Sequence, residues 1–396
     1  MNEDKMKEKL YRLQKIDWEF SDYGGFSSFP ADINSLHWYP APFIPQIPAI
    51  LIRALTEKGE TILDPFAGVG VALIEAAKLK RKFIGVDINP YAVNIMKAKF
   101  CALSIANKEW LLSIEEDMKS LPNVDCIEEY CKKYGIDKEV FKWFEKKTLQ
   151  ELCSLHQYVL SESNEENKLL KKALFSSILQ KCCSQREHYT YVTDGCYPKK
   201  LIYINAINFF LKQAELVTTA AEIFRRQYKI LHDEEWTSPD GFILRGDARN
   251  LDFLKDKSVD MVITSPPYLG VNDYIRSMRL TWLFFPEKGI KKAIDAEIGA
   301  RRKRHRKYAY EEYLRDMDMC FSEISRVLKP GGFLCLTLGK SRGRVCKGNV
   351  VEEILNLLCK YKFKIGMRVS RKIKFRRIQV PGVGSEEVII LNRAMR

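Results

Sequence analysis

Residues 264–268, TSPPY, combine a hydroxyl, two prolines and an aromatic ring at the end of an apolar stretch. The Ser265 hydroxyl oxygen and the Pro266 carbonyl oxygen are suited to accept hydrogen bonds from the exocyclic amino group of a flat ring. Pro266 and Pro267 hold the loop extended and remove an N–H donor that would compete. Tyr268 offers a face on which a displaced base can stack. The alternative is a rigid turn without a chemical role.

A second loop, DPFAGVG at residues 64–70, has the features of a cofactor site. Gly68 and Gly70 let the backbone approach a ligand closely, and the helix that follows offers free N–H groups. Asp87 stands 17 residues after Gly70. Its carboxylate can accept hydrogen bonds from both hydroxyls of a ribose, as the acidic residue of dinucleotide folds does. The G-x-G-x-x-G fingerprint is absent, which suits a nucleoside cofactor without a pyrophosphate. The alternative is another nucleotide-binding fold in which Asp64 caps a helix.

The sequence shows neither a covalent nucleophile nor a metal site. Methylation at C5 of cytosine requires an attacking cysteine, usually within Pro-Cys, and this dipeptide does not occur. The 11 cysteines include no C-x-x-C pair, and the histidines are too scattered for a metal site. Catalysis is therefore expected to depend mainly on positioning two reactants. An odd cysteine count without a secretory signal favours reduced thiols and a cytoplasmic protein, and no apolar run is long enough to span a membrane.

Both loops must be positioned by a sheet, and the chain alternates strand and helix patterns around them. This alternation predicts a right-handed parallel α/β unit. Strands are expected at 61–63, 83–86, 242–244, 259–263 and 333–336, and helices at 71–80, from about 91, and over 310–328. A Pro-Gly-Gly turn at 330–332 should precede the last of these strands. A hairpin is expected from 372–375, a turn near 381–384, and 388–391.

Between about 102 and 240 the pattern is helical and shows few strand signals. A block of this size exceeds any connecting loop, so it is expected to be an inserted helical region. The predicted division is 1–101 with the cofactor loop, 102–240 as the insertion, and 241–396 with the TSPPY loop. The insertion is a candidate for target recognition, and a purely structural cap is the alternative.

The composition favours a polyanionic partner. The net charge is +14 and the pI about 9.1. The densest basic run, at 301–307, follows the TSPPY loop by about 30 residues and can contact phosphates, or it can form a solvated surface. A second, mixed basic and aromatic segment lies at 186–200. The candidate DNA-binding residues are Arg276, Arg279, Arg301, Arg302, Arg304 and Arg306.

Taken together, these motifs resemble the S-adenosylmethionine-dependent DNA amino-methyltransferases of the N4-cytosine and N6-adenine family. The matching stretches are HWYPAPF at 37–43, DPFAGVG at 64–70, IGVDINP at 84–90, GDAR at 246–249, the TSPPY loop and VLKPGG at 327–332. The resemblance covers roughly 35–100 and 240–396 and leaves the insertion without a matching motif.

The resemblance implies a class I methyltransferase fold, with a mostly parallel sheet closed by an antiparallel C-terminal hairpin. It also implies S-adenosylmethionine as the cofactor. Asp64 and Phe66 would lie beside its methionine and adenosine parts, Asp247 near the adenine, and Phe43 at the methionine end. The catalytic loop would be Ser265 to Tyr268, acting on a base flipped out of double-stranded DNA.

The resemblance also bears on the target. Ser-Pro-Pro-Tyr is usual in N4-cytosine enzymes and Asp-Pro-Pro-Tyr in N6-adenine enzymes, so N4 of cytosine is the expected target. A restriction-modification system, with a cognate endonuclease as partner, is the expected setting. Three alternatives stay open: an N6-adenine DNA methyltransferase, an RNA guanine-N2 methyltransferase, and a catalytically silent DNA-binding protein.

Overall fold

The computed structural model describes residues 3–20, 32–185, 189–237, 240–341, 348–372 and 383–394. The strands are β1 (Thr61–Asp64), β2 (Lys82–Asp87), β3 (Gly241–Arg245), β4 (Val259–Thr264), β5 (Leu328–Ser341), β6 (Phe363–Lys372) and β7 (Val383–Arg393). The helices outside the β2–β3 connection are α1 (Glu3–Gln14), α2 (Gln46–Leu55), α3 (Val71–Lys78), α11 (Arg279–Phe284), α12 (Ile290–Ala296), α13 (Ala309–Val327) and α14 (Val350–Cys359). Short 3-10 helices are η2 (Ile33–Leu36), η4 (Arg276–Met278) and η5 (Arg301–His305).

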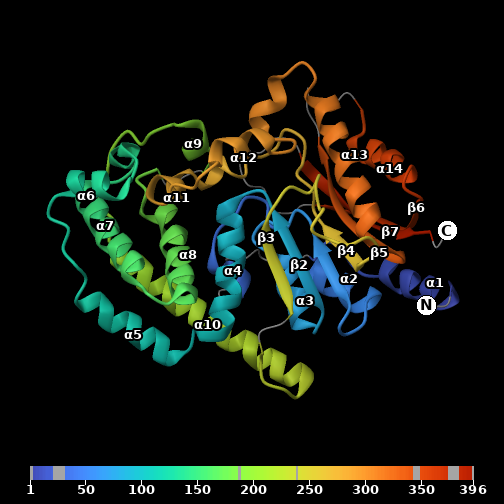
Figure 1. Cartoon of the computed structure of the whole chain (residues 1–396), viewed down its shortest axis with the longest axis horizontal. Helices are drawn as coiled ribbons and strands as arrows, with labels where there is room; N and C mark the ends of the chain where they lie inside the picture. The colour runs from blue at the N-terminus through green and yellow to red at the C-terminus, as the bar shows by residue number, and fades with distance from the viewer. Residues whose placement is uncertain are drawn as a thin grey trace.

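The seven strands form one sheet in the order β3-β2-β1-β4-β5-β7-β6 (Figure 1). Strands β1 to β5 pair in parallel, and β7 runs antiparallel to both β5 and β6. This is the class I methyltransferase sheet, so the predicted fold class is confirmed. The chain leaves β1 toward β2 on one side and returns to β4 on the other. Such a switch point is where ligands bind in open α/β sheets, outside the carboxyl ends of the strands.

Side chains of successive strand residues point to opposite faces, and each face is covered by its own helices. In β4, Met261 and Ile263 pack with α2 and α3, whereas Val262 packs with α13 and α14. The bare part of the sheet is β3 at its edge, where Phe242 is 67% exposed. None of the helices that the structure describes is long and apolar enough to cross a bilayer.

The predicted strands and helices of the sheet are present, with ends shifted by one or a few residues. The Pro-Gly-Gly turn lies inside β5: Val259 pairs with Leu328 and Met261 with Phe333, so the intervening residues bulge out of the ladder. The hairpin is also present, but its first strand, β6, ends at Lys372, where the sequence pattern had it begin. Residues 373–382, which include most of the predicted strand and turn, lie outside the described part.

The connection from β2 to β3 is helical, as expected (Figure 1). It contains α4 (Pro90–Ile105), α5 (Lys108–Lys119), α6 (Ile127–Tyr134), η3 (Lys138–Lys142), α7 (Lys146–Ser161), α8 (Glu165–Cys182), α9 (Tyr189–Asp194) and α10 (Ala206–His232). Its core is continuous with that of the sheet domain: residues of α4, α8 and α10 share one cluster with Leu36 and Val71. The helix α4 runs through residue 102, so the two parts are joined by a shared helix.

Candidate active site

The two predicted loops meet at the carboxyl edge of neighbouring strands. Asp64 is the last residue of β1, and Ser265 directly follows β4. The hydroxyl of Thr264 donates a 2.6 Å hydrogen bond to Asp64 Oδ1, which joins the two loops below their exposed residues. The TSPPY loop therefore stands beside the DPFAGVG loop, as expected from the parallel arrangement of their strands.

The two glycines of the DPFAGVG loop have positive φ, +52° at Gly68 and +78° at Gly70. The space that a side chain would fill is taken by protein at both positions. A Cβ on Gly68 would lie 3.3 Å from Tyr39 Cε1, and one on Gly70 would lie 2.7 Å from Met96 Cγ. Gly70 is therefore required by packing against α4. Gly68 makes room for the ring of Tyr39, which lies across the loop.

Asp87 and Asp64 are the acidic groups of this site. Asp87 accepts hydrogen bonds from the backbone N–H groups of Gly68 and Asn89, both at 2.8 Å, so it ties the ends of β1 and β2 together. Burial raises the pKa of Asp64 to about 7 and that of Asp87 to about 6. Asp64 is buried and Asp87 is half-buried, and carboxylate oxygens at a strand edge can accept hydrogen bonds from the hydroxyl and amino groups of a nucleoside cofactor.

The other predicted cofactor residues lie around this pair to different extents. Asp247 follows β3, and its neighbour Gly246 donates to the Asp87 carbonyl oxygen at 3.1 Å. Its carboxylate is held by the Arg249 guanidinium, with Nη2 at 2.6 Å. Phe66 donates its backbone N–H to Asp64 Oδ1 at 3.1 Å. Phe43 is half-buried and packs between two apolar clusters; from its segment it is Tyr39 that reaches the glycine loop.

In the TSPPY loop, the Ser265 hydroxyl oxygen lies 3.3 Å from the Thr337 carbonyl oxygen and 3.4 Å from the Tyr268 hydroxyl. The carbonyl can only accept, so it directs the single Ser265 proton toward β5. Of the two lone pairs of the Ser265 oxygen, one faces the Tyr268 hydroxyl and the other is left to accept from an amino group. Burial raises the pKa of Tyr268, which therefore stays neutral. Pro266 is buried, and Pro267 and Tyr268 are half-buried.

The segment after the TSPPY loop is fastened to the segment that begins the basic run. Gly270 N–H donates to the Gly299 carbonyl at 2.8 Å, and Arg301 N–H donates to the Asn272 carbonyl at 3.0 Å. Arg302 N–H donates to Asp273 Oδ1 at 3.0 Å. We call these paired segments, 270–275 and 297–302, the loop ladder. The start of the basic run is therefore hydrogen-bonded to the segment that directly follows the TSPPY loop.

Glu297 is the more deeply buried of two buried acids in the loop ladder, with 3% of its surface exposed against 7% for Asp273. Its Oε1 accepts the backbone N–H groups of Tyr274 at 2.6 Å and Ile275 at 3.3 Å. Its Oε2 has no hydrogen-bond partner among the described residues. The ring of Tyr274 stacks on Tyr39, with centroids 6.0 Å apart. Glu297 therefore fixes an aromatic wall that extends from the loop ladder to Gly68.

Glu297 should make the stability depend on pH. Burial, followed by the neighbouring Asp273 charge, raises its pKa from 4.5 to about 8, while two N–H groups and Arg302 act in the opposite direction. Between about pH 5 and 8 the unfolded chain loses this proton and the folded protein keeps it, so the wild type loses stability as pH rises. Glu297→Gln removes this contribution. We expect its free energy of unfolding, relative to wild type, to rise from pH 5 to pH 8 in urea titrations.

The matched control is Glu115→Gln, at an exposed position of α5. Its free energy of unfolding should track the wild type across the same range. Parallel curves for Glu297→Gln and the wild type would show that Glu297 is ionised in the folded protein.

The six arginines of the predicted DNA surface are placed differently. Arg304 and Arg306 are exposed, and Arg306 pairs with Glu312 at 3.2 Å. Arg301 lies 3.4 Å from Asp194, and Arg302 donates to the Ile294 carbonyl. Arg276 is half-buried in η4; its carbonyl accepts from the Arg279 N–H, and its side chain has no hydrogen bond or ion pair with any residue that the structure describes.

Arg279 is engaged inside the protein. Its Nη2 lies 2.5 Å from Glu139 Oε2, and both side chains are mostly buried. Glu139 belongs to η3 of the insertion and Arg279 begins α11, so the pair joins the insertion to the segment after the catalytic loop. The sequence around Arg279 does not indicate this ion pair, because Glu139 lies 140 residues away in the chain.

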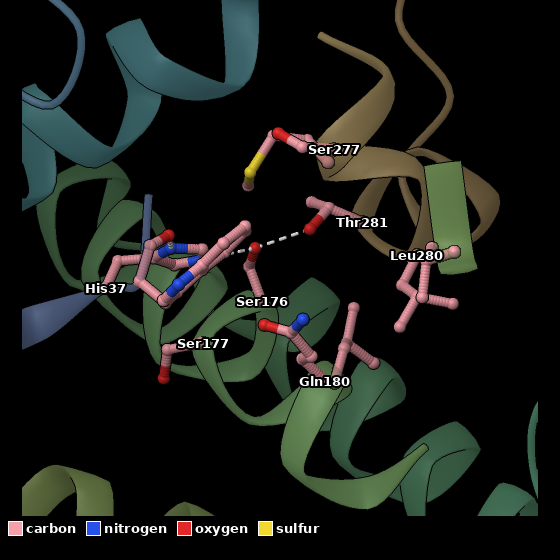
Figure 2. Close-up of a pocket in the computed structure, with 11 residues that line it drawn as sticks. His37, Ser176, Ser177, Gln180, Ser277, Leu280 and Thr281 are labelled. Carbon is pink, nitrogen blue, oxygen red and sulfur yellow. Dashed lines mark hydrogen bonds between the residues drawn. The ribbon is translucent and has the colours of Figure 1, made fainter. Parts of the chain in front are cut away.

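A small hollow lies where residues 37 and 38, the insertion and α11 meet (Figure 2). His37 Nε2 lies 2.7 Å from Ser176 Oγ, which lies 2.6 Å from Thr281 Oγ1. Burial lowers the pKa of His37 to about 4, so the ring is neutral. The hollow has a volume of about 20 Å³, which suits a water molecule and excludes a base.

Comparisons with known proteins give the following similarities. A family model described as DNA methylase matches residues 3–98 and 259–387, more than half of the chain. The type II methyltransferase M.MjaII of Methanocaldococcus jannaschii is 22% identical, over 91% of this chain and 79% of its own length. M.BsoBI of Geobacillus stearothermophilus is 25% identical, over 68% of this chain and 57% of its own length. Among solved structures, the rRNA methyltransferase AviRa of Streptomyces viridochromogenes is 12% identical, covers 94% of both chains and gives a TM-score of 0.38.

Proposed function

The chain belongs to the N6/N4 DNA methylase family, and from this premise we propose that it methylates N4 of cytosine in double-stranded DNA. Family membership makes it a DNA methyltransferase that uses S-adenosylmethionine. The base, the residues that act on it and a setting in a restriction-modification system, with a cognate endonuclease, are our proposal.

We assign the cofactor to the edge formed by β1, β2 and β3. Asp87 would hold the ribose hydroxyls, Asp64 and Phe66 would face the methionine and adenosine parts, and Asp247 would lie at the adenine. Asp87 is half-buried at this edge, and its carboxylate already accepts two backbone N–H groups, so it is held in place to accept further hydrogen bonds from hydroxyl groups. When bound, the cofactor supplies a methyl group carried on a sulfonium, and the amine gives up one proton in return.

The protein's own contribution is to make the amine reactive. Its lone pair is delocalised into the ring, which makes it a poor nucleophile. The Ser265 oxygen and the Pro266 carbonyl oxygen would accept hydrogen bonds from the two N–H groups of the amine. These bonds would favour a tetrahedral nitrogen. Tyr268 would stack against the flipped base. The hydrogen bond toward Thr337 supports this role, because it turns the Ser265 lone pairs outward.

The observation that carries the choice of cytosine is the serine at the first position of this loop, which resembles N4-cytosine enzymes. The test is to express the chain in a host without DNA methylation and to sequence modified bases in its DNA. We expect N4-methylcytosine at one short sequence. N6-methyladenine at a unique sequence would assign the adenine alternative. Methylated RNA with unmodified DNA would overturn the proposal.

We further propose that DNA phosphates bind along the arginines beside the loop ladder. Arg304 is exposed and bonds only its neighbour His305 among the described residues, and the Arg276 side chain has no partner among them, so these two are the freest to contact phosphate. We expect Arg276→Gln with Arg304→Gln to weaken binding to all duplexes and to reduce the slope of log K against log salt by about 2. Fluorescence anisotropy at several salt concentrations measures both effects.

The control for this prediction is Lys58→Gln. Lys58 is exposed just before β1, at the amino ends of the strands and so away from the TSPPY loop. Its salt slope should match the wild type. An unchanged slope in the double variant would show that these arginines form only a solvated surface. The insertion, 102–240, is left as our candidate for reading the target sequence.

A further inference from the structure

Lys99, in α4, is a lysine with none of its surface exposed. Its ammonium donates to the Val69 carbonyl oxygen at 2.7 Å and to Asn34 Oδ1 at 3.2 Å. Both acceptors are neutral. Burial lowers the pKa of Lys99 to about 7, against the opposing effect of Asp32. A buried cation without a bound carboxylate is costly, so a methionine or leucine would fill this position more favourably for stability alone.

The two acceptors belong to the parts of the chain that build the cofactor site. Val69 stands between Gly68 and Gly70, and its carbonyl accepts from Lys99 of α4. Asn34 lies in η2, five residues before Tyr39. Lys99 therefore bridges the glycine loop and the segment that places the Tyr39 ring across Gly68.

The helical insertion holds the same segment from the other side. Gln213 of α10 donates to the Leu36 carbonyl at 3.0 Å, and Ser176 of α8 lies 2.7 Å from His37 (Figure 2). The segment 34–39 is thus fixed between the insertion and Lys99. Without Lys99, it would stay attached to the insertion and lose its hydrogen-bonded link to the Val69 carbonyl, so that only packing contacts would join it to the glycine loop.

We propose that Lys99 is a positioning residue for the cofactor: it fixes the Val69 carbonyl and, through Asn34, the segment that carries Tyr39. The inference rests on the proposed cofactor site. Lys99 touches neither reactant, so it acts on the shape of the loop before the reaction. Its loss should therefore weaken cofactor binding and leave the chemical step on saturated enzyme nearly unchanged.

The test uses Lys99→Met, which keeps the length and apolar stem of the side chain, beside Asn34→Ala and the double variant. We expect Lys99→Met to weaken S-adenosylmethionine binding about 10- to 100-fold, as for loss of a hydrogen bond from a charged group. We expect kcat at saturating cofactor to change less than about threefold. Asn34→Ala should have a smaller effect in the same direction, and the double variant should equal Lys99→Met. Calorimetric titration and steady-state methylation of amplified genomic DNA give these quantities.

Lys97→Met is the matched control, because Lys97 is exposed on the same helix and should retain wild-type affinity. Unchanged cofactor affinity in Lys99→Met, with only a lower free energy of unfolding in urea, would overturn the inference and make Lys99 a structural residue. If Lys99→Met does not fold, Asn34→Ala decides by the same comparison of affinity with kcat. Failure of the site itself is distinguishable, because Asp87→Ala would then also bind the cofactor normally.

Discussion

Replacing Ser265 with alanine should lower the rate of methyl transfer on the order of 10²- to 10³-fold and leave cofactor binding intact. In the proposed mechanism the Ser265 oxygen bonds the amine more strongly as the nitrogen becomes tetrahedral, so its loss affects the transition state more than the bound ground state. Alanine also removes the hydrogen bond to Thr337, but the contacts of Asp64 and Asp87 to backbone N–H groups do not involve Ser265. Single-turnover transfer to DNA, with calorimetric titration of the cofactor beside it, measures the two effects separately.

Tyr268→Ala is the companion variant for this experiment, since it removes a stacking surface from the same loop. It should raise the apparent dissociation constant for DNA more than it lowers the single-turnover rate. Near-normal transfer by Ser265→Ala would mean that the loop is a structural turn and that the amine is held elsewhere.

The second large effect is expected for Asp87→Ala. It should weaken S-adenosylmethionine binding at least tenfold, because charge-assisted hydrogen bonds to the ribose hydroxyls contribute roughly 1.5–3 kcal/mol each. The variant also frees the N–H groups of Gly68 and Asn89, so the loss includes the closed shape of the loop. Calorimetric titration measures the affinity, and circular dichroism confirms that the variant is folded.

Asp125→Ala, at an exposed position of the insertion, is the control and should bind the cofactor as the wild type does. A folded Asp87→Ala protein with unchanged affinity would place the ribose at another strand end. Ser265→Ala and Asp87→Ala should differ in kind, one in rate and the other in affinity.

The sequence predicted the two loops and their meeting because each loop follows an apolar strand, and parallel strands end at the same edge. The roles of Gly68 and Gly70 were predicted only in part. Their positive φ follows from their type, but the rings and chains they make room for, Tyr39 and Met96, depend on how α4 and the N-terminal segment pack.

The residues that sequence reasoning missed act through partners far along the chain. Glu297 holds Tyr274 from 23 positions away, and Lys99 holds Val69 from 30. The spacing of residues near Glu297 or Lys99 in the sequence predicts neither contact. The available signals were compositional: an ionisable residue within an apolar helical pattern for Lys99, and an acid just before the basic run for Glu297. Arg279 is the opposite case: it was predicted to contact DNA phosphate, and its side chain is paired with Glu139 inside the protein.

The contacts of the insertion determine which residues must be exchanged together when the insertion is transplanted between related proteins. Its ends, at β2 and β3, lie on adjacent strands, which would suit transplantation of the whole block. Its inner surface contacts two other segments. Ser176 contacts His37 and Gln213 contacts Leu36 in the first segment, and Glu139 pairs with Arg279 in the second. A chimera that swaps residues 102–240 alone would leave these partners mismatched and buried. A chimera that also carries residues 32–39 and 279–285 from the same donor keeps each residue with its partner, so the structural unit to be exchanged with the insertion is discontinuous in the gene.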